Sequence, residues 1–158
     1  MEQKRLSFDK AKEKALRLLE FRSHSEKELR DKLKYAGADG EDIEKILEFC
    51  RHYGFVNDRE YALRKARDLK NLKKFGRRRI SQELYAKGIS SEHIAMALEE
   101  MDFDDEQEVL LPLVRRKLGG DFERKSVDRC IRYFIYRGYN VSDIKACIDI
   151  IKGEADEL

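Results

Sequence analysis

The strongest chemical signal in the sequence is a dense run of basic residues between positions 64 and 79. Nine of these sixteen residues are lysine or arginine and one is aspartate, so the net charge of the run is +8. Ammonium and guanidinium groups bind phosphates and carboxylates, which points to nucleic acid or an acidic protein groove as the partner. The basic residues are Arg64, Lys65, Arg67, Lys70, Lys73, Lys74, Arg77, Arg78 and Arg79.

A weaker basic cluster follows in the last third of the chain, where acidic residues are mixed with the basic ones. Its main members are Arg115, Arg116, Lys117, Arg124 and Lys125. Either cluster also has a simpler interpretation as the solvated face of a helix. Like charges at this density repel one another, so the first run needs a partner or neighbouring acids. Residues 99–108, with seven acids and no base, can supply such neighbours within the fold.

Catalytic, metal and nucleotide sites are not expected. Asp104, Asp105, Glu106 and Glu108 could together bind a divalent ion, but acids in a first helical turn are better explained by the helix dipole. The three cysteines and three histidines show no metal-ligand spacing, and no glycine-rich phosphate loop is present. We therefore expect no cofactor, no metal and no enzymatic activity, and we expect Cys50, Cys130 and Cys147 to be reduced core residues.

Five tyrosines could stack on nucleic-acid bases, but aromatic residues at helical spacing more often belong to the core. They are Tyr61, Tyr85, Tyr133, Tyr136 and Tyr139.

The elements that position these residues are predicted to be helices. Charged residues make up 42% of the 158, and the chain has a single proline and nine glycines, so few residues interrupt a helix. No apolar run approaches the length of a membrane span, and the amino terminus lacks an apolar signal region. These features favour an all-α protein in the cytoplasm.

Internal repetition defines the predicted organisation. Gly37, Gly88 and Gly138 lie 51 and 50 residues apart, and each is expected to end a helix in the left-handed backbone region. An N-cap residue follows each glycine at Asp39, Ser90 and Asn140, and then an apolar stripe with helical spacing. The stripes are Ile43, Ile46, Leu47 and Cys50; Ile94, Ala97, Leu98 and Met101; Ile144, Cys147, Ile148 and Ile151.

A second helix is predicted before each glycine, with apolar pairs Leu29/Leu33, Ile80/Leu84 and Cys130/Phe134. Their N-caps are predicted at Ser25, Gly76 and Ser126, and Ser25 with Glu28 has the capping-box pattern. Residues 130–137 would form a strand by propensity alone, but the repeat register assigns them to a helix.

A third helix precedes these two. Ala11, Ala15 and Leu18 match Ala62, Ala66 and Leu69, whereas the third copy has Pro112, Arg116 and Gly119 at the same offsets. In that copy the helix is expected to run from a cap at Asp104 to Leu118, with a kink at Pro112. The prediction is three tandem three-helix repeats, at residues 1–57, 58–102 and 103–158, stacked into an elongated, curved array.

Three segments of this pattern resemble the RecX family of bacterial recombinase regulators. They are Arg22-Ser-His-Ser-Glu-Lys-Glu-Leu29 with Leu33 and Gly37, then Gly54-Phe-Val-Asn-Asp-Arg-Glu-Tyr-Ala62, and Gly76-Arg-Arg-Arg-Ile-Ser-Gln-Glu-Leu-Tyr-Ala-Lys-Gly-Ile89. The resemblance implies a non-enzymatic inhibitor that binds the RecA filament on single-stranded DNA and limits its growth, ATP hydrolysis and strand exchange.

Three functions remain open from the sequence: a filament-binding regulator, a general nucleic-acid-binding module, and a helical scaffold. A DNA-binding module should bind bare DNA with a steep salt dependence, a regulator should require the filament, and a scaffold should bind neither. The regulator hypothesis places the working surface on the middle repeat and extends it toward the third. Arg77, Arg78 and Arg79 are expected at its centre, mostly away from the apolar stripe.

Overall fold

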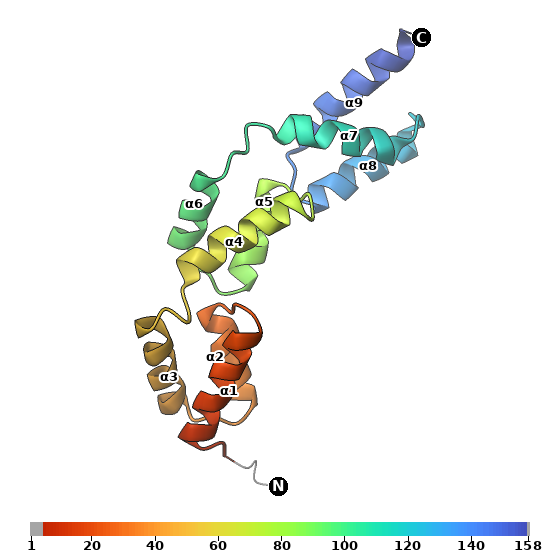
Figure 1. Cartoon of the computed structure of the whole chain (residues 1–158). Coiled ribbons are helices and arrows are strands. Elements are labelled where there is room, and N and C mark those ends of the chain that lie inside the picture. The colour runs from red at the N-terminus through yellow and green to blue at the C-terminus, as the bar shows by residue number, and fades with distance from the viewer. Residues whose placement is uncertain (1–4, 158) are drawn as a thin grey trace. The chain divides into compact units, whose positions relative to one another are not determined.

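The computed structural model describes residues 5–157 and is all-helical over that range, as predicted. Nine α-helices follow one another along the described chain (Figure 1). Their bounds are α1 Phe8–Phe21, α2 Glu26–Tyr35, α3 Gly40–His52, α4 Asp58–Asn71, α5 Arg77–Ala86, α6 Ser91–Glu100, α7 Glu106–Leu118, α8 Arg124–Tyr136 and α9 Val141–Asp156. Leu6 and Ala38, both within the described range, form one isolated β-bridge.

Most predicted helix boundaries are confirmed. Gly37, Gly88 and Gly138 have φ values of +97°, +79° and +99°, so each ends its helix in the left-handed region. Ser25 and Glu28 form both hydrogen bonds of a capping box at the start of α2. Residues 130–137, ambiguous by propensity, lie in α8 and at its C-terminal end.

Three predicted caps are corrected. The N-cap of α8 is Glu123, three residues before the predicted Ser126, and the Ser126 hydroxyl instead donates to Asp121 at 2.6 Å. Asp39 occupies the N-cap position of α3, but its carboxylate pairs with Arg5 rather than capping the helix. The N-cap of α7 is Asp105 rather than Asp104.

The described chain divides into two compact units. Among the described residues, unit 1 contains 5–65 and 84–97, and unit 2 contains 66–83 and 98–157. The core of unit 1 lies among α1, α2 and α3, where the predicted apolar positions are buried, apart from Leu18, which is half-buried. Its members are Ala11, Ala15, Leu29, Leu33, Ile43, Ile46, Leu47, Cys50 and Val56.

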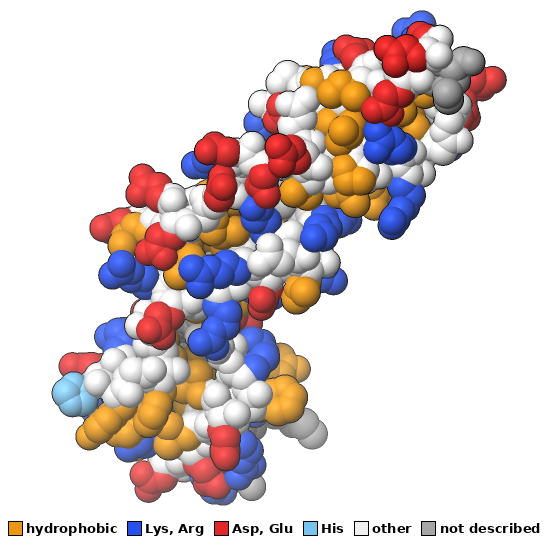
Figure 2. All heavy atoms as spheres, turned by 45° about the horizontal axis from the view of Figure 1, so that its top comes forward, with side chains coloured by type: hydrophobic (Ala, Val, Ile, Leu, Met, Phe, Trp, Pro, Cys, Tyr) orange, Lys and Arg blue, Asp and Glu red, His pale blue; other side chains and the backbone are white. Residues whose placement is uncertain are grey.

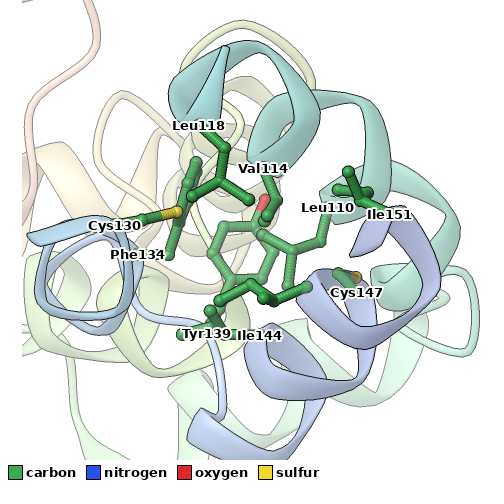
Figure 3. Packing of buried hydrophobic residues seen from close by; sticks show 10 residues of the cluster. Leu110, Val114, Leu118, Cys130, Phe134, Tyr139, Ile144, Cys147 and Ile151 are labelled. Atoms are coloured by element: carbon green, nitrogen blue, oxygen red, sulfur yellow. The ribbon is translucent and has the colours of Figure 1, made fainter. Parts of the chain in front are cut away.

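Unit 2 has its own core among α7, α8 and α9 (Figure 3). In that view, side chains of α7, α8 and α9 converge on one another, and Tyr139, from the segment that joins α8 to α9, lies among them. The buried members are Leu110, Val114, Leu118, Cys130, Phe134, Tyr139, Ile144, Cys147, Ile148 and Ile151.

The first helix of the third copy uses a different register from the other two. The positions aligned with Ala11 and Ala15 are Pro112 and Arg116, and both are exposed. The buried face of α7 is instead Leu110, Val114 and Leu118, which are spaced four residues apart. The alignment through Gly138 fails here because α8 has 13 residues, whereas α2 and α5 have 10 each. The offset counted back from the glycine therefore no longer marks the buried face.

The predicted apolar positions of the middle helices are also buried, apart from Met101, which is half-buried. They are Ala62, Ala66 and Leu69 in α4, Ile80 and Leu84 in α5, and Ile94, Ala97 and Leu98 in α6. None of the described helices is long and apolar enough to cross a membrane.

Candidate functional site

The loop between α4 and α5, residues 72–76, is anchored by the end of α8 and the residues after it. The Gly76 amide donates to the Arg137 carbonyl at 2.9 Å, and the Tyr139 hydroxyl donates to the Lys74 carbonyl at 2.6 Å. The Arg137 guanidinium also donates to the Lys73 carbonyl. Because these contacts hold the backbone from one side, the side chains of Leu72, Lys73 and Lys74 are exposed. We call residues 72–76 the anchored loop.

Two glycines allow this contact. The Gly76 Cα lies so near the other chain segment that a Cβ added there would be 2.5 Å from the Gly138 carbonyl oxygen. A Cβ on Gly138 would be 2.4 Å from the Arg79 backbone nitrogen. Side chains larger than hydrogen do not fit at either position, so the anchored loop depends on glycine at both.

Aromatic rings and cations alternate across the same region. The Arg79 guanidinium carbon is 4.5 Å from the Tyr136 ring centroid and 4.9 Å from that of Phe75. The Arg137 guanidinium carbon is 4.9 Å from the Phe75 centroid and 5.5 Å from the Tyr133 centroid. The Lys117 ammonium is 4.1 Å from the Tyr133 centroid. This alternating series ties the anchored loop to α5, α7 and α8 through cation–π attraction.

Beside the series lies an open groove of about 450 Å³, which we call the basic groove. Its lining has five cations and no carboxylate among the described residues, together with apolar groups. It consists of Leu72, Lys73, Lys74, Leu113, Arg116, Lys117, Tyr133, Phe134 and Arg137. The groove therefore combines positive potential with apolar and aromatic surface.

The acidic segment 99–108 neutralises another part of the basic run. Lys70 pairs with Asp105 at 3.1 Å and donates to the Asp102 carbonyl. The Arg77 backbone amide donates to the Glu106 carboxylate at 2.8 Å, and burial raises the pKa of Glu106. The face shown in Figure 2 likewise has Lys and Arg side chains interspersed with Asp and Glu. The prediction that these acids neighbour the basic run within the fold is confirmed at these positions.

Two predicted site residues, Lys70 and Arg79, form ion pairs within the protein and have little exposed side chain. Lys70 has 16% of its side chain exposed and Arg79 has 19%. Arg79 pairs with Glu83 at 2.9 Å and donates to the Tyr136 carbonyl at 3.1 Å. The side chains of Tyr136 and Glu83 raise its pKa. Arg79 is therefore packed against neighbouring residues, whereas Arg77 and Arg78 are exposed.

The remaining predicted site residues are dispersed. Lys73, Lys74, Arg116 and Lys117 meet in the basic groove. Arg67, Arg124 and Lys125 are exposed elsewhere in unit 2, and Arg115 forms a bidentate pair with Glu154 at 2.8 and 3.1 Å. Arg64 and Lys65 belong to unit 1, where the Arg64 guanidinium is 3.4 Å from the Ser23 hydroxyl.

Sequence reasoning missed Arg137 and Leu72 and misjudged several tyrosines. Tyr139 is buried, as expected of a core residue, but Tyr85, Tyr133 and Tyr136 are 76%, 39% and 71% exposed. A signal for this was present: all three fall off the apolar stripe that runs through Ile80, Leu84, Cys130 and Phe134.

The histidines, acids and cysteines considered as metal ligands or reactive thiols are placed as follows. Within residues 5–157 no three His, Cys, Asp or Glu side chains are grouped closely enough to hold a metal ion. Cys50, Cys130 and Cys147 are unpaired and buried, and burial raises the pKa of each thiol.

Comparison with known families gives two matches along the chain. Residues 11–50 match a model described as the first three-helix domain of RecX, and residues 57–98 match one described as the second. These matches cover most of α1–α3 and of α4–α6.

Named relatives match over most of the chain. Regulatory protein RecX of Cronobacter sakazakii is 32% identical over 90% of this chain and 93% of its own length. That of Vibrio vulnificus is 33% identical over 85% and 88%. The chain spans 68% and 64% of the RecX proteins of Clostridium botulinum and Clostridium beijerinckii.

Solved structures show the same fold. The crystal structure of RecX from Lactobacillus salivarius superposes with a TM-score of 0.78 at 22% identity and covers 92% of this chain and 96% of its own. A second RecX crystal structure gives 0.81 at 24% identity, with 90% and 73% coverage.

Proposed function

Because this chain belongs to the RecX family of regulatory proteins, we propose that it binds the RecA recombinase filament on single-stranded DNA. Bound there, it limits filament growth, ATP hydrolysis and strand exchange, and it does so without catalysing a reaction of its own. We expect it to act in the cytoplasm, where the filament forms.

The observation that carries the proposal, beyond family membership, is the basic groove. Four residues that the sequence predicted as binding residues lie together there with Arg137, and no carboxylate lies in the lining within the described chain. A nucleoprotein filament presents phosphates and acidic side chains, and both are bound by clustered cations. Arg77, Arg78 and Arg67 are exposed on the same unit and extend the proposed contact set.

The direct test adds the purified protein to its own species' RecA, preassembled on single-stranded DNA, and measures ATP hydrolysis. We expect inhibition that rises with the amount of protein added and saturates. No inhibition at saturating protein, with filament binding also absent by co-sedimentation, would contradict the proposed function.

A matched pair of variants tests the surface. We expect Lys73→Gln, Lys74→Gln and Arg116→Gln together to weaken inhibition by tenfold or more, since each charge-assisted contact contributes about 1.5–3 kcal/mol. The control neutralises Lys14, Lys34 and Lys45, which are equally exposed but belong to unit 1. Equal inhibition by both folded variants would place the working surface elsewhere while leaving the family function intact.

The two alternative functions give different outcomes in the same experiments. A general nucleic-acid-binding module would bind bare duplex and single strands as tightly as it binds the filament, with a steep salt dependence. A scaffold would leave both DNA and the filament unaffected.

A further inference from the structure

The basic groove has features that a site for phosphates alone does not need. Its lining includes Leu72, Leu113 and the Tyr133 ring. Its cations are Lys73, Lys74, Arg116, Lys117 and Arg137. Leu72 is 76% exposed although it is large and apolar. A ligand that matches this lining carries negative charges along its edge and flat apolar surface between them.

Single-stranded nucleic acid has that chemistry. Its phosphates alternate with bases whose π faces are open, and such strands bind to grooves that combine cations with exposed aromatic rings. A duplex keeps its base faces stacked internally, so only its phosphates could meet this lining. An acidic peptide supplies the charge but no flat surface for Tyr133 and the leucines.

The Tyr133 ring, on which a base could stack, is fixed in position by its neighbours. Its position is fixed by edge contact with Phe134, at 4.9 Å between centroids, and by the alternating series that includes Arg137. One ring face is covered by the Lys117 ammonium at 4.1 Å. Lysine has a long flexible stem, so a base that stacks on Tyr133 displaces this ammonium toward the adjacent phosphate.

The anchored loop presents two of the phosphate-binding groups without further ordering. Three hydrogen bonds hold its backbone, and Lys74 keeps a left-handed φ of +56°, which is uncommon for a residue with a side chain. Because the loop backbone is fixed before binding, ordering it costs the complex little free energy.

We propose that the basic groove binds single-stranded nucleic acid directly, with a base stacked on Tyr133 and phosphates on Lys73, Lys74, Arg116 and Lys117. The inference deepens the proposed function, since it assigns the DNA strand rather than the recombinase as the ligand of this groove. It is tested without the recombinase, so that its failure does not decide the fate of the proposed function.

The experiment measures fluorescence anisotropy of two labelled single strands, an oligothymidylate and an abasic oligomer with the same number of phosphates. We expect the wild type to bind oligothymidylate about 5- to 100-fold more tightly than the abasic strand, as stacking of one base provides. Tyr133→Leu should reduce the affinity for oligothymidylate to that for the abasic strand. Tyr133→Phe, which keeps the ring, should retain the preference.

Controls separate stacking from loss of fold and from charge. Tyr85→Leu removes an exposed tyrosine that lies outside the groove, and it should change neither affinity. Lys73→Gln with Lys74→Gln should reduce the salt slope by about 0.7 for each lysine. Circular dichroism of each variant checks the fold.

Three results would overturn the inference: equal affinity of the wild type for both strands, an unchanged preference in folded Tyr133→Leu, or competition by polyglutamate as effective as that by oligothymidylate. If any of these occurs while filament ATP hydrolysis is still inhibited, the groove is a protein-binding or phosphate-binding surface and the proposed function stands.

Discussion

At the scale of single residues, Gly138 and Gly120 share a left-handed backbone but differ in what surrounds them. Their φ values are +99° and +79°. A Cβ on Gly120 would meet nothing within 4 Å, whereas one on Gly138 would lie 2.4 Å from the backbone nitrogen of Arg79. Alanine substitutions at the two glycines therefore separate two contributions to the free energy of unfolding. One is the cost of a left-handed backbone, and the other is the cost of a steric clash.

Gly120→Ala should lower the free energy of unfolding by about 1–2 kcal/mol, which is the left-handed penalty. Gly138→Ala should cost more than that, because the backbone contact with Gly76 and Arg79 must also open. Urea denaturation of both variants measures the difference. Equal losses would show that the contact between the anchored loop and Gly138 contributes nothing to stability.

His24 is a buried residue whose neighbours determine its protonation state. It is 2% exposed, with Nδ1 2.9 Å from the Arg22 carbonyl oxygen and Nε2 3.0 Å from the Lys32 ammonium. In this arrangement Nδ1–H donates and Nε2 accepts, so the ring is neutral. Burial lowers the pKa of His24 below 6.5, and the nearby positive charges of Arg22 and Lys32 act in the same direction.

The fold is therefore expected to lose stability as the pH falls below 6.5, because the unfolded chain then protonates His24 while the folded chain does not. Unfolding free energies on either side of that pH should show this slope in the wild type and a flatter one in His24→Gln. His52→Gln, at an exposed position, is the control and should keep the wild-type slope. The same slope in His24→Gln and the wild type would show that His24 does not cause the loss of stability at low pH.

At the scale of elements, the start of α2 is a polar junction rather than a simple cap. The Ser25 hydroxyl accepts from the Glu28 amide at 3.1 Å and donates to the Lys87 carbonyl at 2.6 Å. Burial alone would raise the pKa of Glu28, but hydrogen bonds from Arg22, Tyr61 and the Ser25 amide outweigh it and lower the pKa to about 2.

Ser25→Ala should lower the free energy of unfolding by about 2 kcal/mol or more, because it removes a cap and leaves the partly buried Lys87 carbonyl without its donor. Ser7→Ala removes an exposed cap of α1, where the hydroxyl accepts from Lys10 at 3.3 Å, and should cost about 0.5–1 kcal/mol. Thermal unfolding followed by circular dichroism compares them. A Ser7 variant as destabilised as the Ser25 variant would show that the junction with Lys87 adds nothing.

Helix positions and buried stripes could be predicted from the sequence because both depend on local spacing. Periodicity and glycine stops located α2, α3, α8 and α9 to within a few residues. The buried face of α7 was not identified from the repeat, since a count back from a distant glycine does not detect that α8 is three residues longer than α2 and α5. The cap at Ser126 failed because α8 begins one turn earlier than its counterparts.

The candidate site was predicted less well, because its members come together only through tertiary contacts. Charge density identified Lys73, Lys74, Arg116 and Lys117, but it gave equal weight to Arg79, which is packed between two rings. Whether an arginine is exposed or packed depends on residues such as Phe75 and Tyr136, which are adjacent in space and distant in sequence. No local pattern contains that information.

At the scale of the whole molecule, two units share three helices. The boundary between the units falls between Lys65 and Ala66 within α4, between Glu83 and Leu84 within α5, and between Ala97 and Leu98 within α6. Helix formation is cooperative, so melting one end of such a helix weakens the other. The units are therefore expected to unfold together.

Leu33→Ala in unit 1 and Phe134→Ala in unit 2 should each lower the midpoint of one shared transition, at a cost of roughly 2–5 kcal/mol. Far-UV circular dichroism during urea titration measures this. A biphasic curve in which Leu33→Ala shifts one step and Phe134→Ala the other would show that the units are independent.

The buried cysteines give each unit its own chemical reporter. Cys50 lies in the core of unit 1, and Cys130 and Cys147 lie in that of unit 2. A disulfide reagent in solution is attacked only by a thiolate that it can reach, and here burial both shields the sulfur and raises the pKa of the thiol. The rate at which each thiol is modified in the native protein is thus set by how often the surrounding helices separate. Labelling kinetics read by mass spectrometry would report transient opening around each sulfur, with no probe introduced into the chain.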